Sequence, residues 1–205
     1  MKKIYFITAT NTDVGKTYAS KVLLNKFAKK GKKVGYVKPI ETGVVDDPLD
    51  GTKLFNVVKK LNKKYKRLSI NNIVPYQFEL PAAPYVAKKN KKIKISKILD
   101  TIKYHFKYCD ILIVEGAGGL MVPIKKSYFM IDLIYDISKK FDTKTILISS
   151  SKLGNINDTL LSIDMLKKYK IDYKWYINLY KDKKNFKKVS LPFYKKYFKK
   201  ISYLK

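Results

Sequence analysis

The segment from Asp110 to Glu115 constrains the fold more than any other part of the chain. Its central residues, Ile111-Leu112-Ile113-Val114, are apolar without a break, so a strand formed here has no face suited to water. Strands buried on both faces are typical of parallel sheets, because crossover helices cover both sides. Residues 144–149 form a second stretch of this kind. The sequence therefore predicts a mainly parallel sheet flanked by helices.

Helical patterns alternate with the expected strands along the chain. Ala19, Leu23 and Phe27 fall on one face of a helix, and Gly31 is placed to end it. Further expected helices cover 51–60, 98–106 and a segment capped by Asn157 or Asp158, with Ile156, Leu160 and Ile163 toward the core. The expected strands cover 3–9, 33–38, 110–115, 144–149 and 173–178, and 74–84 is expected to be a loop. This order predicts a single α/β domain over residues 1–205.

The charge of the chain is strongly positive. It has 45 basic and 16 acidic residues and a formal net charge of +29. Arg67 is the only arginine, whereas proteins that bind bases or phosphates bidentately rely on arginine. Because lysine is spread through almost every segment, we interpret the charge as a solvated surface that attracts anionic ligands. We expect neither a nucleic-acid partner nor a membrane partner.

Cys109 and His105 are the only cysteine and the only histidine. These counts exclude an internal disulfide framework and a multi-cysteine metal site. Both residues lie just before the expected strand 110–115, far from its carboxyl end, and we interpret them as structural. No apolar run approaches the roughly 20 residues of a membrane helix, and no signal peptide is visible. We therefore expect a cytoplasmic protein.

Gly15-Lys16-Thr17 lies between the apolar segment 3–9 and the helix that follows it. The loop amides and the helix N-terminus can hold phosphates, Lys16 can reach the terminal phosphates, and the Thr17 hydroxyl can bind Mg²⁺. Thr10 stands where the pattern G-x-x-x-x-G-K-[ST] has its first glycine. The strand before and the helix after still favour a phosphate-binding loop over a lysine that merely follows a turn.

A nucleotide site with a metal ion also needs carboxylates. Glu115 ends an apolar strand and precedes a glycine-rich turn. Ligands gather at the carboxyl ends of parallel strands, where Glu115 and Thr17 are both expected. The alternative is a glutamate that caps the next turn. A second carboxylate can come from Asp50, Asp46 or Asp47, and the spacing does not choose among them.

Further motifs follow the phosphate loop in a fixed order. With that loop, the segments are Thr10-Asn11-Thr12-Asp13-Val14-Gly15-Lys16-Thr17, Tyr36-Val37-Lys38-Pro39-Ile40-Glu41-Thr42-Gly43, Asp50, Pro75-Tyr76, Pro81-Ala82-Ala83-Pro84, Val114-Glu115-Gly116-Ala117-Gly118-Gly119, Lys152-Leu153-Gly154-Asn155-Ile156-Asn157, Trp175 and Asn178. Many proteins share a phosphate loop alone, but K-P-x-x-[ST]-G followed by V-E-G-A-G-G is specific. Together the segments resemble the dethiobiotin synthetase family of the P-loop NTPase superfamily.

The resemblance implies an ATP-dependent carbon–nitrogen ligase of biotin biosynthesis with a P-loop NTPase-like fold. CO₂ would add to one amine of 7,8-diaminopelargonic acid to give a carbamate. ATP would phosphorylate the carbamate oxygen to give a carbamic-phosphoric anhydride, and the second amine would close the ureido ring of dethiobiotin. Mg²⁺ and fixed cations would stabilise the charge on the transferring phosphoryl group. The resemblance also implies a homodimer, because the family completes its substrate site across the dimer interface.

The resemblance carries roles over to individual residues. Lys16 and Lys38 would be catalytic, and Mg²⁺ would be bound by Thr17, Asp50 and Glu115. The implied ATP-binding residues are Thr12, Asp13, Val14, Gly15, Lys16, Thr17, Tyr18, Asp50, Glu115, Gly116, Ala117, Gly118, Asn178, Pro192 and Phe193. The implied substrate-binding residues are Thr12, Lys38, Thr42, Gly154 and Asn155. Asn178 matches an asparagine that recognises adenine, although Leu179 departs from the acidic residue that is common after it.

Two other functions stay open at this level. A nucleotide-switch ATPase of the partitioning type would bind DNA with the basic surface, but such proteins carry an extra lysine early in the loop, and residues 11–14 contain none. A relative that has lost catalysis would instead serve as a basic binding protein, which the short lysine-rich segment after residue 180 suits. In that segment Tyr194, Tyr197, Phe198 and Ile201 recur at helical spacing, and we expect them to pack on the core rather than on a membrane.

Overall fold

The chain folds around a five-stranded sheet in the order β2-β5-β1-β8-β9, and every neighbouring pair in it is parallel. The computed structural model describes residues 2–180 and 182–204. The strands are β1 (Lys3–Ala9), β2 (Val34–Val37), β5 (Ile111–Glu115), β8 (Thr143–Ser150) and β9 (Tyr173–Asn178). All five residues of β5 are buried. The predicted α/β class and mainly parallel sheet are confirmed.

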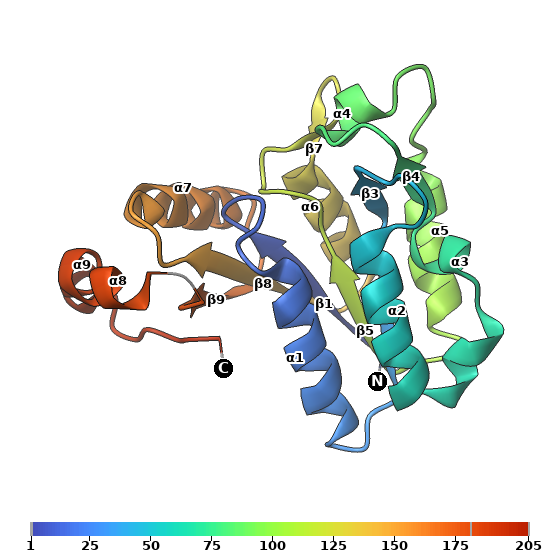
Figure 1. Ribbon diagram of the computed structural model, residues 1–205, viewed down its shortest axis with the longest axis horizontal. Helices are drawn as coiled ribbons and strands as arrows, with labels where there is room; N and C mark the ends of the chain where they lie inside the picture. Colours follow the sequence, from blue (N-terminus) through green and yellow to red (C-terminus); the bar gives the residue numbers. More distant parts are fainter. Residues whose placement is uncertain (1, 181, 205) are drawn as a thin grey trace.

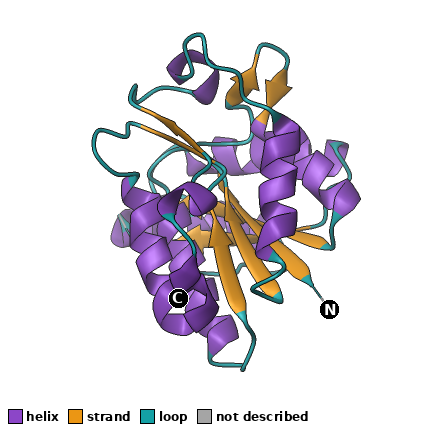
Figure 2. Ribbon diagram, turned by 90° about the vertical axis from the view of Figure 1, so that its right-hand side faces the viewer, coloured by secondary structure: helices purple, strands orange, loops and turns teal. Residues whose placement is uncertain are grey.

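Helices cover both faces of this sheet (Figure 2). The helices of the described chain are α1 (Lys16–Ala28), α2 (Leu49–Leu61), α3 (Ile70–Ile73), α4 (Pro84–Ala87), α5 (Ile95–His105), α6 (Met130–Lys140), α7 (Asn155–Lys168), α8 (Lys183–Val189) and α9 (Leu191–Tyr197), with a 3₁₀ turn η1 (Lys63–Arg67). In Figure 1, α1 and α2 lie in front of the sheet and α6 lies behind it. None of the described helices has the length and apolar character needed to span a bilayer.

The strand register brings the phosphate loop next to the end of β5. Ile7 of β1 pairs with Glu115, and Ala9 pairs with Ile148 of β8. Because β1 ends two residues beyond the level of Glu115, the loop that follows it turns over the carboxyl end of β5. The sequence prediction that Thr17 and Glu115 share this edge of the sheet is confirmed by their hydrogen bond.

Two small sheets and α4 lie beyond the carboxyl ends of the main strands, in the upper part of Figure 1. In one, β3 (Ile40–Thr42) pairs with β4 (Tyr76–Phe78), and in the other, β6 (Pro123–Lys125) pairs with β7 (Tyr128–Phe129). The expected loop over 74–84 is therefore wrong in part. Residues 76–78 form a strand, and Pro84 begins a helix at a position where its missing N–H costs nothing.

The start and the buried face of α7 differ from the sequence prediction. The cap is Gly154, whose φ of 88° is left-handed, so Asn157 and Asp158 lie inside the first turn. Asn155 and Thr159 point inward together with Ile163, whereas Ile156 and Leu160 are only half-buried. Two polar residues can occupy the inner face because the Tyr194 hydroxyl hydrogen-bonds to both. The apolar spacing therefore indicated a face of α7 that lies next to the buried one.

The C-terminal segment packs on the sheet, as the apolar spacing predicted, except that the side chain of Tyr197 is exposed. Tyr194 and Phe186 are fully buried, and the ring centroid of Trp175 in β9 lies 4.6 Å from that of Phe198. Residues 202–204 then run along the edge of β9. The Ile177 N–H donates to the Ser202 carbonyl and the Leu204 N–H donates to the Ile177 carbonyl, each at 2.9 Å.

Candidate active site

A cavity of about 1110 Å³ opens at the carboxyl ends of the strands. Among the predicted site residues, its lining includes Thr12, Asp13, Gly15, Lys16, Thr17, Tyr18, Lys38, Thr42, Asp50, Ala117, Gly118 and Asn178. Val14, Glu115 and Gly116 are buried outside this lining. The cavity therefore gathers residues from both halves of the sequence at the edge of the sheet where the sequence placed the site.

The phosphate loop is held in one conformation by its contact with β9. Gly15 caps α1 with a φ of 105°, and a Cβ on it would collide with the side-chain amide of Asn178. That amide donates to the Val14 carbonyl at 2.9 Å, and its oxygen accepts from the Tyr180 N–H at 3.2 Å. Only glycine suits position 15, because it tolerates the left-handed conformation and leaves room for Asn178.

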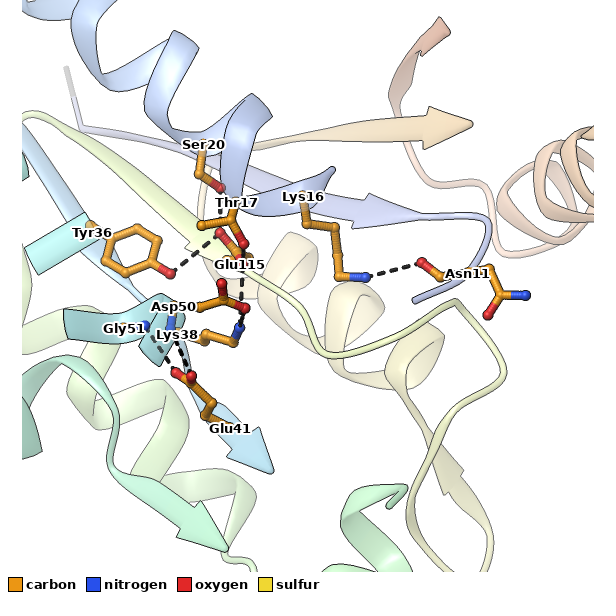
Figure 3. Close-up of polar contacts among 10 residues, drawn as sticks. All are labelled: Asn11, Lys16, Thr17, Ser20, Tyr36, Lys38, Glu41, Asp50, Gly51 and Glu115. Carbon is orange, nitrogen blue, oxygen red and sulfur yellow. Dashed lines mark hydrogen bonds and ion pairs between the residues drawn. The ribbon is translucent and has the colours of Figure 1, made fainter. Parts of the chain in front are cut away.

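Lys16 points back over the phosphate loop. Its Nζ donates to the Asn11 carbonyl at 3.1 Å, and the side chain lines the cavity (Figure 3). Burial lowers the pKa of the Lys16 ammonium to about 8, although the Glu115 carboxylate opposes this shift. An anion bound in the loop would stabilise the charged form of Lys16 strongly, because charges interact more strongly away from water.

Glu115 is completely buried and lies at the centre of the polar network (Figure 3). Its Oε1 accepts from the Thr17 hydroxyl at 3.0 Å and from Lys38 Nζ at 3.4 Å. Its Oε2 accepts from the Ser20 hydroxyl at 2.6 Å and from the Tyr36 hydroxyl at 3.3 Å. These donors come from α1 and from the end of β2, so they do not fit the alternative in which Glu115 caps the turn that follows it.

Lys38 lies between two carboxylates. Its Nζ is 2.5 Å from Asp50 Oδ2 and 3.4 Å from Glu115 Oε1. Burial lowers the pKa of Lys38, but the nearby carboxylates outweigh it and the pKa is raised. Burial also raises the pKa of Asp50, and here Lys38 outweighs it, so that pKa is lowered. Both groups are therefore charged at neutral pH.

Three oxygen-bearing side chains in this network fit a magnesium ion. Asp50 lines the cavity, whereas Asp46 and Asp47 are exposed and lie outside its lining. Across residues 2–180 and 182–204, three or more His, Cys, Asp or Glu side chains nowhere cluster into a metal site. Two carboxylates and the Thr17 hydroxyl suit Mg²⁺, which binds few protein oxygens and completes its shell with water and phosphate.

Besides Val14, Glu115 and Gly116, four predicted residues lie outside the cavity lining, namely Gly154, Asn155, Pro192 and Phe193. The Asn155 side chain is buried against the C-terminal segment, where its Nδ2 donates to the Ser190 hydroxyl at 3.0 Å and its Oδ1 accepts from the Tyr194 hydroxyl at 2.6 Å. The substrate-binding role predicted for that side chain does not fit this arrangement. Gly154, next to it, is exposed.

Pro192 and Phe193 also lie outside the cavity lining. They belong to α9, and the ring centroid of Phe193 lies 5.2 Å from that of Tyr197. The cavity wall beside Asn178 is made instead by residues that the sequence did not single out for nucleotide binding, namely Leu179, Tyr180, Lys183 and Leu204. Sequence reasoning missed Leu204 because only its long-range pairing with β9 brings it there.

Glu41 also lines the cavity and was not predicted as a site residue. It lies within the matched segment from Tyr36 to Gly43, but that match assigned it no chemistry. Its spacing from Asp50 gives no local pattern, because the two residues meet only when β3 packs against the start of α2.

Comparison with solved structures confirms the fold. A plasmid partition protein from Borrelia burgdorferi aligns with 99% of this chain and 89% of its own, with a TM-score of 0.57 and 13% sequence identity. A second structure, of a putative plasmid partition protein from B. burgdorferi B31 bound to AMPPNP, aligns with 99% of this chain and 86% of its own, with a TM-score of 0.54 and 12% identity. At these identities the likeness extends to the fold alone.

Sequence comparison identifies the family. Residues 3–185 match the family described as AAA domain. The ATP-dependent dethiobiotin synthetase BioD of Sulfurovum sp. (strain NBC37-1) is 50% identical over 191 residues, which cover 92% of this chain and 88% of that protein. The protein of the same name from Wolinella succinogenes is 36% identical over 94% of this chain and 88% of its own. The chain belongs to the dethiobiotin synthetase family.

Proposed function

We propose that this chain is a Mg·ATP-dependent dethiobiotin synthetase that converts 7,8-diaminopelargonic acid and CO₂ to dethiobiotin. One observation carries the proposal: two buried lysines and two carboxylates meet a phosphate loop at the end of one large cavity. Its volume of about 1110 Å³ exceeds that of most single-ligand pockets. It therefore suits a nucleotide and a second substrate together.

The nucleotide would occupy the side of the cavity formed by the phosphate loop and β9. The amides at the start of α1 and the Lys16 ammonium would hold the phosphates, as helix N-termini do for anions. Leu179, Tyr180 and Leu204 would form the wall beside the base. The Asn178 side chain already bridges Val14 and Tyr180, so adenine recognition by this residue would require it to exchange these hydrogen bonds.

The diamine would occupy the side formed by β3 and the loop before α4. Thr42 offers a hydroxyl there, and Pro81, Ala82 and Ala83 offer an apolar surface. That combination suits a substrate with a long aliphatic chain and polar amines at one end. Lys38, which also lines the cavity, would lie near the carbamate to which the phosphoryl group has to be transferred.

Lys38 would act as a fixed cation. Its raised pKa keeps it protonated, so it can hold the negative carbamate oxygen against the phosphates but cannot take a proton from the diamine. Lys16 would balance charge on the other side of the transferring group. A magnesium ion held by Thr17, Asp50 and Glu115 would supply further neutralisation of the phosphates when bound.

The active form in this proposal is a homodimer in the cytoplasm, without a nucleic-acid or membrane partner. Leu153 and Gly154 are exposed, and Gly154 lies outside the lining of its own cavity. A contact between this loop and the distal carboxylate of the substrate would therefore come from a second copy. Light scattering at low micromolar concentration is expected to show a dimer, and an active monomer would contradict the shared site.

The deciding experiment measures ADP release from Mg·ATP and bicarbonate, with and without diaminopelargonic acid, together with the mass of the product. We expect ADP release that depends on the diamine and a product with the mass of dethiobiotin. ATP turnover that ignores the diamine but rises with added DNA would replace this proposal with a partitioning-type ATPase. Nucleotide binding without turnover in either case would indicate a relative that has lost catalysis.

A further inference from the structure

Glu41 joins β3 to the first turn of α2 through both of its carboxylate oxygens. Its Oε1 accepts from the Asp50 N–H and its Oε2 accepts from the Gly51 N–H, each at 2.9 Å (Figure 3). The residue is 6% exposed, so these bonds are shielded from water. Because both oxygens accept backbone hydrogen bonds from the same helix turn, Glu41 braces β3 against the start of α2.

The first turn of α2 depends on this external carboxylate. Backbone amides at the start of a helix have no partner within the helix, and a capping side chain normally supplies one. The residue before α2 is Pro48, which has no side-chain oxygen. Glu41, which lies in β3, accepts these hydrogen bonds in place of a capping residue. Its negative charge is favourable at the positive end of the helix.

The contact is closely fitted at Gly51. A Cβ at this position would lie 3.0 Å from Glu41 Oε2 and would collide with Val74. The glycine thus lets the carboxylate and the helix approach each other, and even an alanine would push them apart. The arrangement therefore ties the position of α2 to that of Glu41 with little tolerance.

Asp50 is the side chain whose position this brace controls. It lies in the first turn of α2, its own N–H is the one held by Glu41, and its carboxylate reaches Lys38 at 2.5 Å. We infer that Glu41 is a positioning residue that sets the Asp50 carboxylate for Mg²⁺ binding. The inference rests on the proposed function, in which Asp50, Thr17 and Glu115 hold the ion.

The test compares Glu41→Ala and Glu41→Gln with the unchanged protein by calorimetric titration of ADP, with and without Mg²⁺. Loss of a residue that orients a metal ligand typically weakens metal binding by about 10- to 100-fold. We expect the alanine variant to lose most of the Mg²⁺-dependent gain in ADP affinity, while its metal-free ADP affinity changes less than about twofold. The glutamine variant keeps one accepting oxygen, so we expect it to recover part of the gain.

Asp132→Ala is the matched control. The Asp132 carboxylate accepts from the Phe129 N–H at 2.7 Å and so caps α6 outside the active-site network. This variant should unfold at a lower denaturant concentration without any change in the Mg²⁺ requirement. If Glu41→Ala behaves in the same way, Glu41 is a structural cap only and the inference is overturned. Should the alanine variant fail to fold, the glutamine variant decides by the same measurement.

Asp50→Asn separates this inference from the function on which it rests. If Asp50→Asn leaves the Mg²⁺ dependence of ADP binding intact, Asp50 is not a metal ligand, and that part of the proposed function fails first. If Asp50→Asn weakens it and neither Glu41 variant does, only the positioning role is overturned. Because ADP binding is measured directly, the result does not depend on whether the protein makes dethiobiotin.

Discussion

Two buried polar clusters lie near opposite ends of β5, and they differ in charge. At the carboxyl end, Glu115 accepts hydrogen bonds from several donors and faces Lys38 beneath an open cavity. Before the amino end, the Tyr65 hydroxyl donates to His105 Nδ1 at 2.7 Å, and His105 Nε2 donates to the Asn72 carbonyl at 2.9 Å. Cys109, also buried, donates to the His105 carbonyl at 3.3 Å.

Buried groups are neutral in one cluster and charged in the other, because only the cluster around Glu115 contains groups of opposite charge. Burial lowers the pKa of His105 to about 4, and the hydrogen bond to Asn72 does not outweigh it. Burial likewise raises the pKa of the Cys109 thiol to about 12. Both groups are therefore neutral at pH 7. Lys38 is also buried, yet it stays charged because carboxylates surround it, which leaves a cation in the wall of the cavity.

The largest expected effect on catalysis is that of Lys16→Ala, at the same end of the sheet as Glu115. Loss of one fixed cation at a phosphoryl-transfer centre should lower kcat by about a thousandfold, toward the upper end of single-group effects. Dethiobiotin formation and far-ultraviolet circular dichroism are measured together, and the fold should be retained. Full activity in a folded variant would remove the phosphate-loop lysine from the mechanism.

Lys38→Ala should separate catalysis from metal binding. We expect kcat to fall by about a hundredfold because the carbamate loses its cation. Without nucleotide, Mg²⁺ should bind more tightly than in the unchanged protein, because Asp50 and Glu115 lose the ammonium that lies between them. Calorimetry measures the second effect. Lys144→Ala, which breaks an exposed pair with Asp172, should change neither quantity, and unaltered turnover in Lys38→Ala would contradict the role of Lys38.

Tyr65→Phe should affect only stability. The change removes one hydroxyl and leaves His105 Nδ1 without its donor in a buried site. Leaving a buried polar group unsatisfied costs about 1–3 kcal/mol in the free energy of unfolding. Urea denaturation measures this loss, while kcat should stay within about twofold of the unchanged protein, the tolerance expected away from the reacting atoms. A large fall in kcat would show that the two clusters are coupled.

A pH dependence of stability is expected from His105, with no effect on catalysis. The unfolded imidazole binds a proton near pH 6.5 and the buried one near pH 4. Between these values the unfolded chain holds more protons, so the free energy of unfolding falls as the pH is lowered through this window. Urea denaturation at pH 7 and pH 4.5 should show a steeper loss for the unchanged protein than for His105→Gln. Equal slopes would indicate that the imidazole is already charged in the fold.

Residues whose role is local were predictable from the sequence, and residues brought together over long distances were not. The apolar run before Glu115 indicated a buried strand, and the glycine and lysine before Thr17 indicated a phosphate loop. Glu41 and Leu204 escaped because each acts on an element other than its own: Glu41 on the start of α2, and Leu204 on β9. A periodicity argument has no access to such pairings.

Polar residues in the interior caused the remaining errors. Asn155 was expected to face the substrate, yet it packs inward because Tyr194 and Ser190 supply its hydrogen bonds. The same network turned α7 away from the face that its apolar residues indicated. Hydropathy predicts that such a residue lies at the surface or contacts a ligand. Its place in the interior can be recognised only when the positions of its hydrogen-bond partners are known.

The pairing of residues 202–204 with β9 bears on how the protein is tagged or immobilised. Leu204 lines the cavity, so an affinity tag, fluorescent protein or surface linker fused after it would leave the molecule beside the cavity opening. Lys3 begins β1 at the opposite, amino edge of the sheet. A fusion placed before it would keep bulky sequences away from the cavity, which makes that end the better choice for any binding or turnover assay.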